Sequence, residues 1–132
     1  MSEKILLVGE EEDFLSCLIE QIRARDMRVS RAVSGKSGLE MAARENFSIV
    51  LLNLTVPGSD GIEMLKKFKQ INPELEVFFL SRHVTAKKGI HAMKLGAADL
   101  LDKSADPQIL AEKIAKSRAR KMLSVRKSQI SG

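Results

Sequence analysis

The hydrophobic positions of this chain fall into five short runs at a spacing of about 25 residues. Runs of this length, rich in Ile, Leu, Val and Phe and bounded by polar or turn residues, predict β-strands. The second run carries charged and polar residues between its apolar ones, so we expect that strand at the edge of a sheet. The five predicted strands cover residues 4–8, 27–33, 49–53, 77–80 and 100–101.

Each predicted strand is followed by a segment in which apolar residues recur at helical spacing. Ser34 is expected to cap the second helix, Asn72-Pro73 to end the third, Gly96 to end the fourth, and Asp106-Pro107 to begin the fifth. The inward-facing positions are expected at Phe14, Leu15, Leu18, Ile19 and Ile22, at Leu39, Met41 and Ala42, at Ile62, Leu65 and Phe68, and at Ile109, Leu110 and Ile114.

Five strands that each lead into a helix indicate an α/β domain, with a parallel sheet covered by helices on both faces. Right-handed crossovers place the carboxyl ends of such strands along one edge, where ligands and chemistry collect. The residues at those ends are Gly9 with Glu10, Asn53, Ser81 and Lys103. We therefore expect them to converge in space.

Asn53 stands at the centre of this edge. It ends a run that reads as a strand buried on both faces, and Pro57-Gly58 with Asp60-Gly61 predicts a loop directly after it. The chemistry of the chain is expected to depend on this side chain.

Composition narrows the class of protein. The 132 residues suffice for one domain, and no apolar run approaches the roughly 20 residues that span a bilayer. The run at 5–8 is too short for a signal peptide and is followed by acids, so we expect a cytoplasmic protein. The single Cys17 offers no disulfide, and His83 and His91 lack partners at metal-ligand spacing.

The positive net charge of +5 belongs to the end of the chain. Residues 111–132 hold seven Lys or Arg and one acid. We expect a folded domain over residues 1–118 and a basic helical extension or linker over residues 119–132. The extension reads as an amphipathic helix with three open interpretations: a solvated face, a partner or self-association helix, or a nucleic-acid contact. No aromatic residue interleaves with the basic ones, so nucleic-acid binding is the least expected.

The triplet Gly35-Lys36-Ser37 resembles part of a phosphate-binding loop. That motif requires a glycine five positions earlier, where this chain has Ser30. The acidic run at residues 10–13 would likewise repel a flavin phosphate. Neither nucleotide nor flavin chemistry is expected, and the chain is not expected to be an enzyme.

Four segments together resemble the receiver domain of bacterial two-component response regulators. They are ILLV followed by acids, LLNLTVPGSDG, FFLS and GAADLLDK. The resemblance spans residues 4 to about 118 and keeps the order and spacing of these landmarks. It implies a flavodoxin-like (CheY-like) doubly wound sheet of five parallel strands in the order 2-1-3-4-5, with helices on both faces.

The resemblance also implies which residues are functional. In that family an Asp after the third strand accepts a phosphoryl group, with Mg²⁺ held by an acidic pair after the first strand. A Ser or Thr and a Lys bind the phosphoryl oxygens, and Ser81 and Lys103 match these two. The acceptor position holds Asn53, and the acidic pair falls on Gly9 and Glu10.

These departures change the expected chemistry. An amide is a poor nucleophile, so Asn53 is not expected to accept phosphate. Glu10 remains as a metal ligand without its partner, so Mg²⁺ binding should be weak or lost. Lys103 is expected to hydrogen-bond the Asn53 carbonyl or to pair with Glu10, and Ser81 to cap a strand end. Leu100 replaces an aromatic that swings inward on activation in the family.

The joint loss at Gly9, Asn53 and Leu100 favours a pseudo-receiver that binds another protein independently of phosphorylation. The expected partner is a histidine kinase, an effector domain or another regulator, with a homodimer as a further option. Two alternatives remain: a phosphorylatable, Mg²⁺-dependent receiver seen as an acceptor-site mutant, and a nucleic-acid-associated regulator acting through the basic tail.

Overall fold

The computed structural model describes residues 3–10, 12–54, 60–82 and 84–131. Five parallel strands form one sheet in the order β2-β1-β3-β4-β5, which confirms the predicted topology. The strands are β1 (Lys4–Val8), β2 (Arg28–Ala32), β3 (Ile49–Asn53), β4 (Glu76–Ser81) and β5 (Asp99–Asp102). The helices are α1 (Asp13–Arg23), α2 (Gly35–Arg44), α3 (Asp60–Ile71), α4 (Ala86–Lys94) and α5 (Pro107–Ser131).

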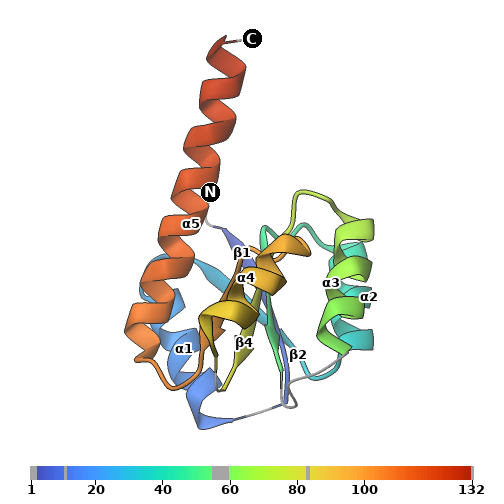
Figure 1. The fold of residues 1–132 in the computed structure, drawn as a ribbon, viewed down its shortest axis with the longest axis vertical. Coiled ribbons are helices and arrows are strands. Elements are labelled where there is room, and N and C mark those ends of the chain that lie inside the picture. The colour runs from blue at the N-terminus through green and yellow to red at the C-terminus, as the bar shows by residue number, and fades with distance from the viewer. Residues whose placement is uncertain (1–2, 11, 55–59, 83, 132) are drawn as a thin grey trace.

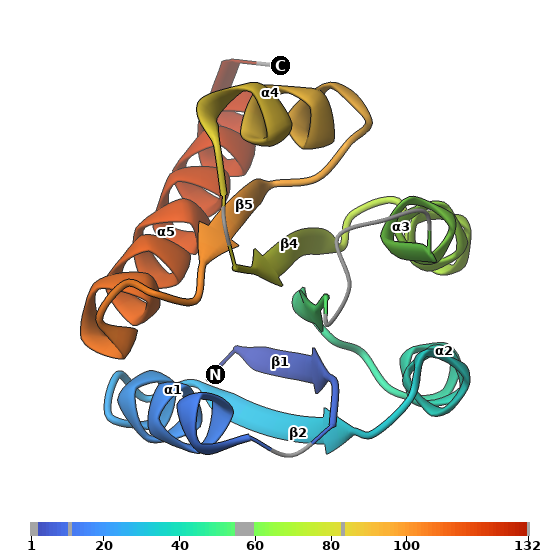
Figure 2. The same cartoon turned by 60° about the horizontal axis from the view of Figure 1, so that its bottom comes forward.

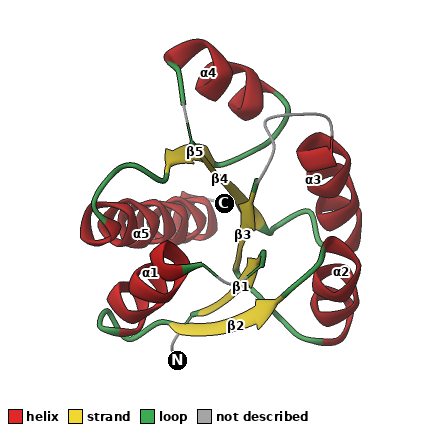
Figure 3. Cartoon of the chain, turned by 90° about the horizontal axis from the view of Figure 1, so that it is seen from below, coloured by secondary structure: helices red, strands yellow, loops and turns green. Residues whose placement is uncertain are grey.

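The sheet separates two hydrophobic layers. Helices α1 and α5 cover one face, while α2 and α3 cover the other (Figure 3). Alternate residues of the central strands point into the two layers. Leu7 and Leu51 pack with α1 and α5, whereas Leu6 and Val50 pack with α2 and α3. Burial on both faces explains why these strands are continuous apolar runs. Strand β2 lies at the edge, as its mixed polarity predicted.

Side-chain caps fix the helix starts that the sequence predicted. Ser34 and Ser37 form a reciprocal capping box at the start of α2. The Asp106 carboxylate accepts a hydrogen bond of 2.9 Å from the backbone N–H of Gln108, at the start of α5. Each cap satisfies a backbone donor that would otherwise lack a partner.

Two local expectations were wrong. Helix α3 already begins at Asp60, so Asp60 and Gly61 belong to its first turn and not to the preceding loop. Ile109 is half exposed, because α5 turns Leu110, Ala111 and Ile114 toward the sheet. The predicted loop residues Pro57 and Gly58 lie outside the described residues.

Helix α5 is anchored where it leaves the domain. Glu76, at the start of β4, is buried and accepts a 2.9 Å hydrogen bond from the Ser117 hydroxyl. Arg118 pairs with Glu76 at 3.4 Å and with Glu3 at 3.0 Å, and Lys121 contacts Glu74. We call this group the α5 anchor: Glu3, Glu74, Glu76, Ser117, Arg118 and Lys121.

Beyond the anchor, α5 extends past the rest of the domain (Figure 1). The proposed boundary at residue 118 therefore lies inside one continuous helix. In the described parts of the chain, no helix combines the length and apolar character that crossing a bilayer requires.

A pair of glycine substitutions tests the packing of α2 on the sheet. A Cβ at Gly38 would lie 2.8 Å from a methyl group of Val8, whereas a Cβ at Gly89 in α4 meets nothing within 4 Å. We expect G38A to lower the free energy of unfolding by about 1–3 kcal/mol. The matched variant G89A should raise it by about 0.5–1 kcal/mol, because Ala favours a helix over Gly. Urea unfolding of both variants measures this, and equal effects would contradict the packing.

Candidate functional site

Three side chains from distant parts of the sequence meet at the carboxyl edge of the sheet. Asn53 ends β3, and Lys103 follows β5 directly. Glu12 immediately precedes α1. Figure 2 shows this edge, with the ends of β1 and β3 beside each other and α1 starting close by. We call these three residues the Glu12–Asn53–Lys103 cluster.

The ammonium group of Lys103 is the buried centre of this cluster. Its side chain is 5% exposed. Lys103 Nζ donates to Asn53 Oδ1 at 2.8 Å and to Glu12 Oε2 at 3.1 Å, and it lies 2.9 Å from Glu12 Oε1. The predicted hydrogen bond from Lys103 to Asn53 is therefore present. A desolvated ammonium is held here by one carboxylate and one amide oxygen.

Both ends of the Asn53 amide are engaged. Its oxygen accepts from Lys103, and its Nδ2 donates to Glu12 Oε2 at 3.0 Å. A carboxylate at position 53 has no N–H to donate and would instead place a second negative charge beside Glu12. The hydrogen bonds of this cluster therefore require an amide at this position.

Glu12, not Glu10, is the acid that pairs with Lys103. Glu10 is exposed and makes no hydrogen bond or ion pair with the described residues, so the expected Lys103–Glu10 pairing was wrong. Glu12 is the N-cap residue of α1 with extended backbone angles, and its side chain turns back toward the sheet instead of capping the helix. The sequence carried one signal for this role of Glu12, because it is an acid directly before a predicted helix. A residue at this N-cap position takes non-helical backbone angles, which allow its side chain to turn away from the helix.

The charge of Glu12 is stabilised by its neighbours. The hydrogen bond from Lys103 lowers the pKa of the Glu12 carboxyl; partial burial opposes this shift, and the hydrogen bond from Asn53 adds to it. Glu12 is therefore ionised at neutral pH.

Gly9 provides the space for Asn53. A Cβ at position 9 would lie 2.6 Å from Asn53 Cβ and 3.1 Å from its amide nitrogen. Any other residue at position 9 would push the end of β1 or the Asn53 side chain aside. The absence of a side chain at Gly9 and the position of the Asn53 side chain are therefore structurally linked.

The other two predicted site residues lie outside the cluster. Ser81 is buried, and its hydroxyl donates to the backbone oxygen of Arg82 at 3.0 Å. Leu100 is partly buried and packs against the hydrophobic layer under α2 and α3. Neither one contributes a polar contact to the Glu12–Asn53–Lys103 cluster.

The described residues of this edge do not form a set of Mg²⁺ ligands. Gly9 has no ligand atom, Glu10 points to solvent, and the available oxygens of Glu12 and Asn53 face the Lys103 ammonium. Within the described ranges, no three side chains of His, Cys, Asp or Glu lie together as a group that could hold a metal ion. Mg²⁺ requires several oxygen ligands in near-octahedral geometry, so the residues present do not fit this ion.

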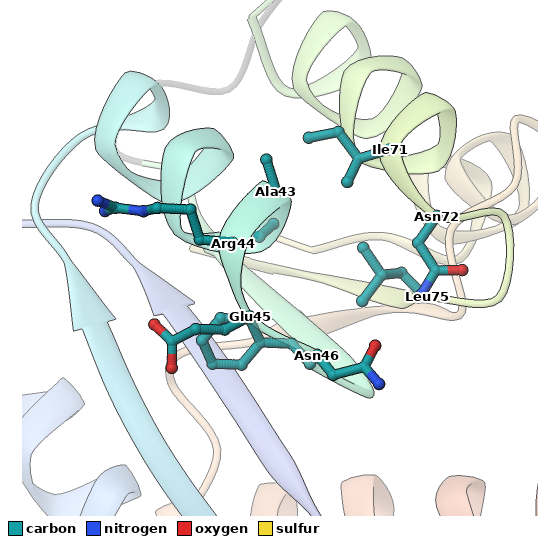
Figure 4. Close-up of a pocket in the computed structure, with 9 residues that line it drawn as sticks. Ala43, Arg44, Glu45, Asn46, Ile71, Asn72 and Leu75 are labelled. Atoms are coloured by element: carbon teal, nitrogen blue, oxygen red, sulfur yellow. The ribbon is translucent and has the colours of Figure 1, made fainter.

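A separate cavity lies at the opposite edge of the sheet. It has a volume of about 370 Å³ between the ends of α2 and α3, and Arg44, Asn46, Ile71 and Leu75 are among its lining residues (Figure 4). Asn46 and Leu75 precede β3 and β4, so this cavity is remote from the Glu12–Asn53–Lys103 cluster. It holds none of the predicted site residues.

The pKa shift of Glu12 predicts a pH-dependent contribution to stability. In the folded protein the pKa of the Glu12 carboxyl lies below its ordinary value of 4.5. Ionised Glu12 therefore stabilises the fold fully above pH 4.5, and this stabilisation is lost as the pH falls through the folded-state pKa. We expect E12Q to be about 1–3 kcal/mol less stable than the parent near neutral pH. The difference should shrink in acid.

Urea unfolding at several pH values measures this difference. E10Q is the matched control, because it removes an exposed carboxylate two residues away that has no contact with the described residues. Its stability curve should follow the parent curve. A constant difference between E12Q and the parent at every pH would contradict the assigned role of the Glu12 charge.

Comparison with known proteins identifies the family to which this fold belongs. The family model for the response regulator receiver domain matches residues 5–115. The transcriptional regulatory protein ZraR of Klebsiella oxytoca is 31% identical over 106 residues, which cover 79% of this chain and 24% of ZraR. The sporulation initiation phosphotransferase F of Bacillus subtilis is 30% identical over 97 residues, covering 74% of this chain and 78% of that protein.

A solved structure shows the same fold. The CheY-like response regulator receiver domain protein of Methanospirillum hungatei JF-1 superimposes with a TM-score of 0.80 at 20% identity, covering 94% of this chain and 99% of that one. The chain spans about a quarter of the length of ZraR. It belongs to the response regulator receiver domain family of two-component signalling proteins.

Proposed function

We propose that this chain is a pseudo-receiver, a receiver domain that is not phosphorylated at residue 53 and works as a phosphorylation-independent protein-interaction module. The observation that carries this proposal is the Asn53 amide, hydrogen-bonded at both ends by Glu12 and Lys103. In this proposal the domain is not an enzyme, and its affinity for Mg²⁺ is weak or lost.

The chemistry of an amide supports the first part. Forming an acyl phosphate requires a carboxylate oxygen that attacks phosphorus. The nitrogen lone pair of Asn53 is delocalised into its carbonyl, and the carbonyl oxygen already accepts from the Lys103 ammonium. Residue 53 therefore lacks the negative charge that attack on phosphorus needs, and its carbonyl oxygen is only weakly nucleophilic.

An exposed helix face supports the second part. On α4, Ile90 and Met93 are 56% and 52% exposed, and they are spaced to share one face of the helix. Lys87 and Lys94 are exposed and spaced to lie beside this face, and the sequence from residue 82 to 98 contains no Asp or Glu. We infer that this face binds an acidic segment with apolar side chains on a signalling protein. We call this surface the α4 face: Lys87, Ile90, Met93 and Lys94.

Membership of the receiver family supports the proposed class of signalling protein. A histidine kinase, an effector domain or another regulator in a cytoplasmic two-component pathway is the proposed partner. A homodimer and a nucleic-acid contact through the basic end of α5 are less favoured, because the α4 face pairs apolar side chains with one sign of charge.

Intact-mass measurement tests the proposed loss of phosphorylation. After incubation with Mg²⁺ and a small-molecule phosphodonor such as acetyl phosphate, we expect no covalent gain of a phosphoryl group. A receiver that retains its acceptor Asp and acidic pair, treated in parallel, is the positive control. A stable phosphoryl adduct on the parent chain would overturn the proposal.

One observation favours a second candidate, a phosphorylatable receiver with a substituted acceptor. Lys103 is retained and contacts residue 53 directly, at 2.8 Å. The N53D variant separates the two candidates. The pseudo-receiver predicts that N53D still gains little phosphate, because Gly9 supplies no metal ligand, whereas the second candidate predicts efficient phosphorylation after this single change.

The α4 face is tested by introducing negative charges at its apolar centre. For a signalling protein that binds the chain, we expect the I90E/M93E variant to bind at least about tenfold more weakly, a loss of about 1.4 kcal/mol or more. V33E is the matched control, since Val33 is 69% exposed at the end of β2. Equal affinity of I90E/M93E and V33E, measured by calorimetry, would exclude the α4 face.

A further inference from the structure

We propose that Glu12 is an intramolecular latch that keeps oxyanions away from Lys103. This inference rests on the proposed function, because it concerns a pocket that is not phosphorylated. It extends that function by assigning a regulatory contact between α1 and the ends of β3 and β5.

The first argument is the occupancy of the Lys103 ammonium. A lysine ammonium has three N–H donors. Two of them go to Asn53 Oδ1 and Glu12 Oε2, and Glu12 Oε1 lies 2.9 Å from the same nitrogen. The Lys103 side chain is 5% exposed. An incoming oxyanion can reach this ammonium only by replacing the Glu12 carboxylate.

The second argument is that the latch can open without unfolding the core. The Glu12 side chain is 26% exposed and comes from the connection before α1, outside the hydrophobic layers. Its Oε1 is paired with the Lys103 ammonium at 2.9 Å without hydrogen-bond geometry, whereas Oε2 accepts two hydrogen bonds. Movement of this one side chain would free Lys103 while the strands stay in place.

The third argument concerns how the latch is built. Gly9 lets the end of β1 approach Asn53 so closely that a Cβ would lie 2.6 Å from Asn53 Cβ. In this position the Asn53 Nδ2 reaches Glu12 and holds it against Lys103. Gly9 and Asn53 thereby position the latch, and Glu12 closes it.

The chemistry of the competitor follows from these contacts. A group that displaces Glu12 must offer anionic oxygens at hydrogen-bond distance from the ammonium, as a phosphate or a carboxylate does. The exchange replaces one ion pair with another and forms no covalent bond. In this inference an acidic group binds at Lys103 only after the Glu12 side chain has moved away from the ammonium.

Phosphate titration tests the latch. We expect E12Q to show saturable binding of inorganic phosphate in Mg²⁺-free buffer at constant ionic strength, at least tenfold tighter than the parent chain. Amide chemical shifts of residues 53 and 103 report the binding. E10Q removes the same charge from an exposed neighbour and should behave like the parent. The double variant E12Q/K103M should lose the gained binding.

Each outcome decides the inference. Equal phosphate binding by E12Q and E10Q, or tighter binding that survives in E12Q/K103M, would overturn it. E12A, which removes both charge and bulk, gives the same test if E12Q does not fold. The titration contains no phosphodonor, so it tests the latch separately from covalent phosphorylation. The titration can contradict the latch while intact mass still shows no phosphorylation, and it can support the latch even if intact mass shows a phosphoryl adduct.

Discussion

A buried ammonium group must have a counter-charge, and this requirement organises the functional edge of the domain. An unpaired lysine in a desolvated position costs several kcal/mol, which is a large share of the stability of a small domain. Lys103 therefore draws Glu12 and Asn53 into contact and ties the ends of β3 and β5 to the start of α1. The ion pair between Lys103 and Glu12 thereby holds these three elements together at the carboxyl edge of the sheet.

The contacts also link Gly9, Glu12 and Asn53 to one another. Asn53 can donate to Glu12 because it is an amide, and it reaches Glu12 because Gly9 leaves the space open. Substitution at one of these positions changes the fit at the others. The cluster forms one unit whose members contact each other, so the effects of single substitutions within it are expected to be non-additive.

Much of this arrangement was predictable from the sequence, for identifiable reasons. Buried parallel strands produce continuous apolar runs, and right-handed crossovers bring their carboxyl ends together, so the proximity of Asn53 and Lys103 followed from topology. The choice between Glu10 and Glu12 did not follow, because the backbone angles of a connecting segment decide which side chain turns inward. Ile109 was misplaced for a related reason: helical spacing gives a period, but the packing partner selects the face.

The α5 anchor has a mechanical consequence. Ser117, Arg118 and Lys121 tie one turn of α5 to the amino-terminal edge of the sheet, and residues 122–131 continue as helix beyond it. At a rise of about 1.5 Å per residue, this part acts as a lever arm about 15 Å long. A tilt of about 10° at its base would move its tip by about 2.6 Å, so a sub-ångström shift at the sheet edge is amplified along the helix.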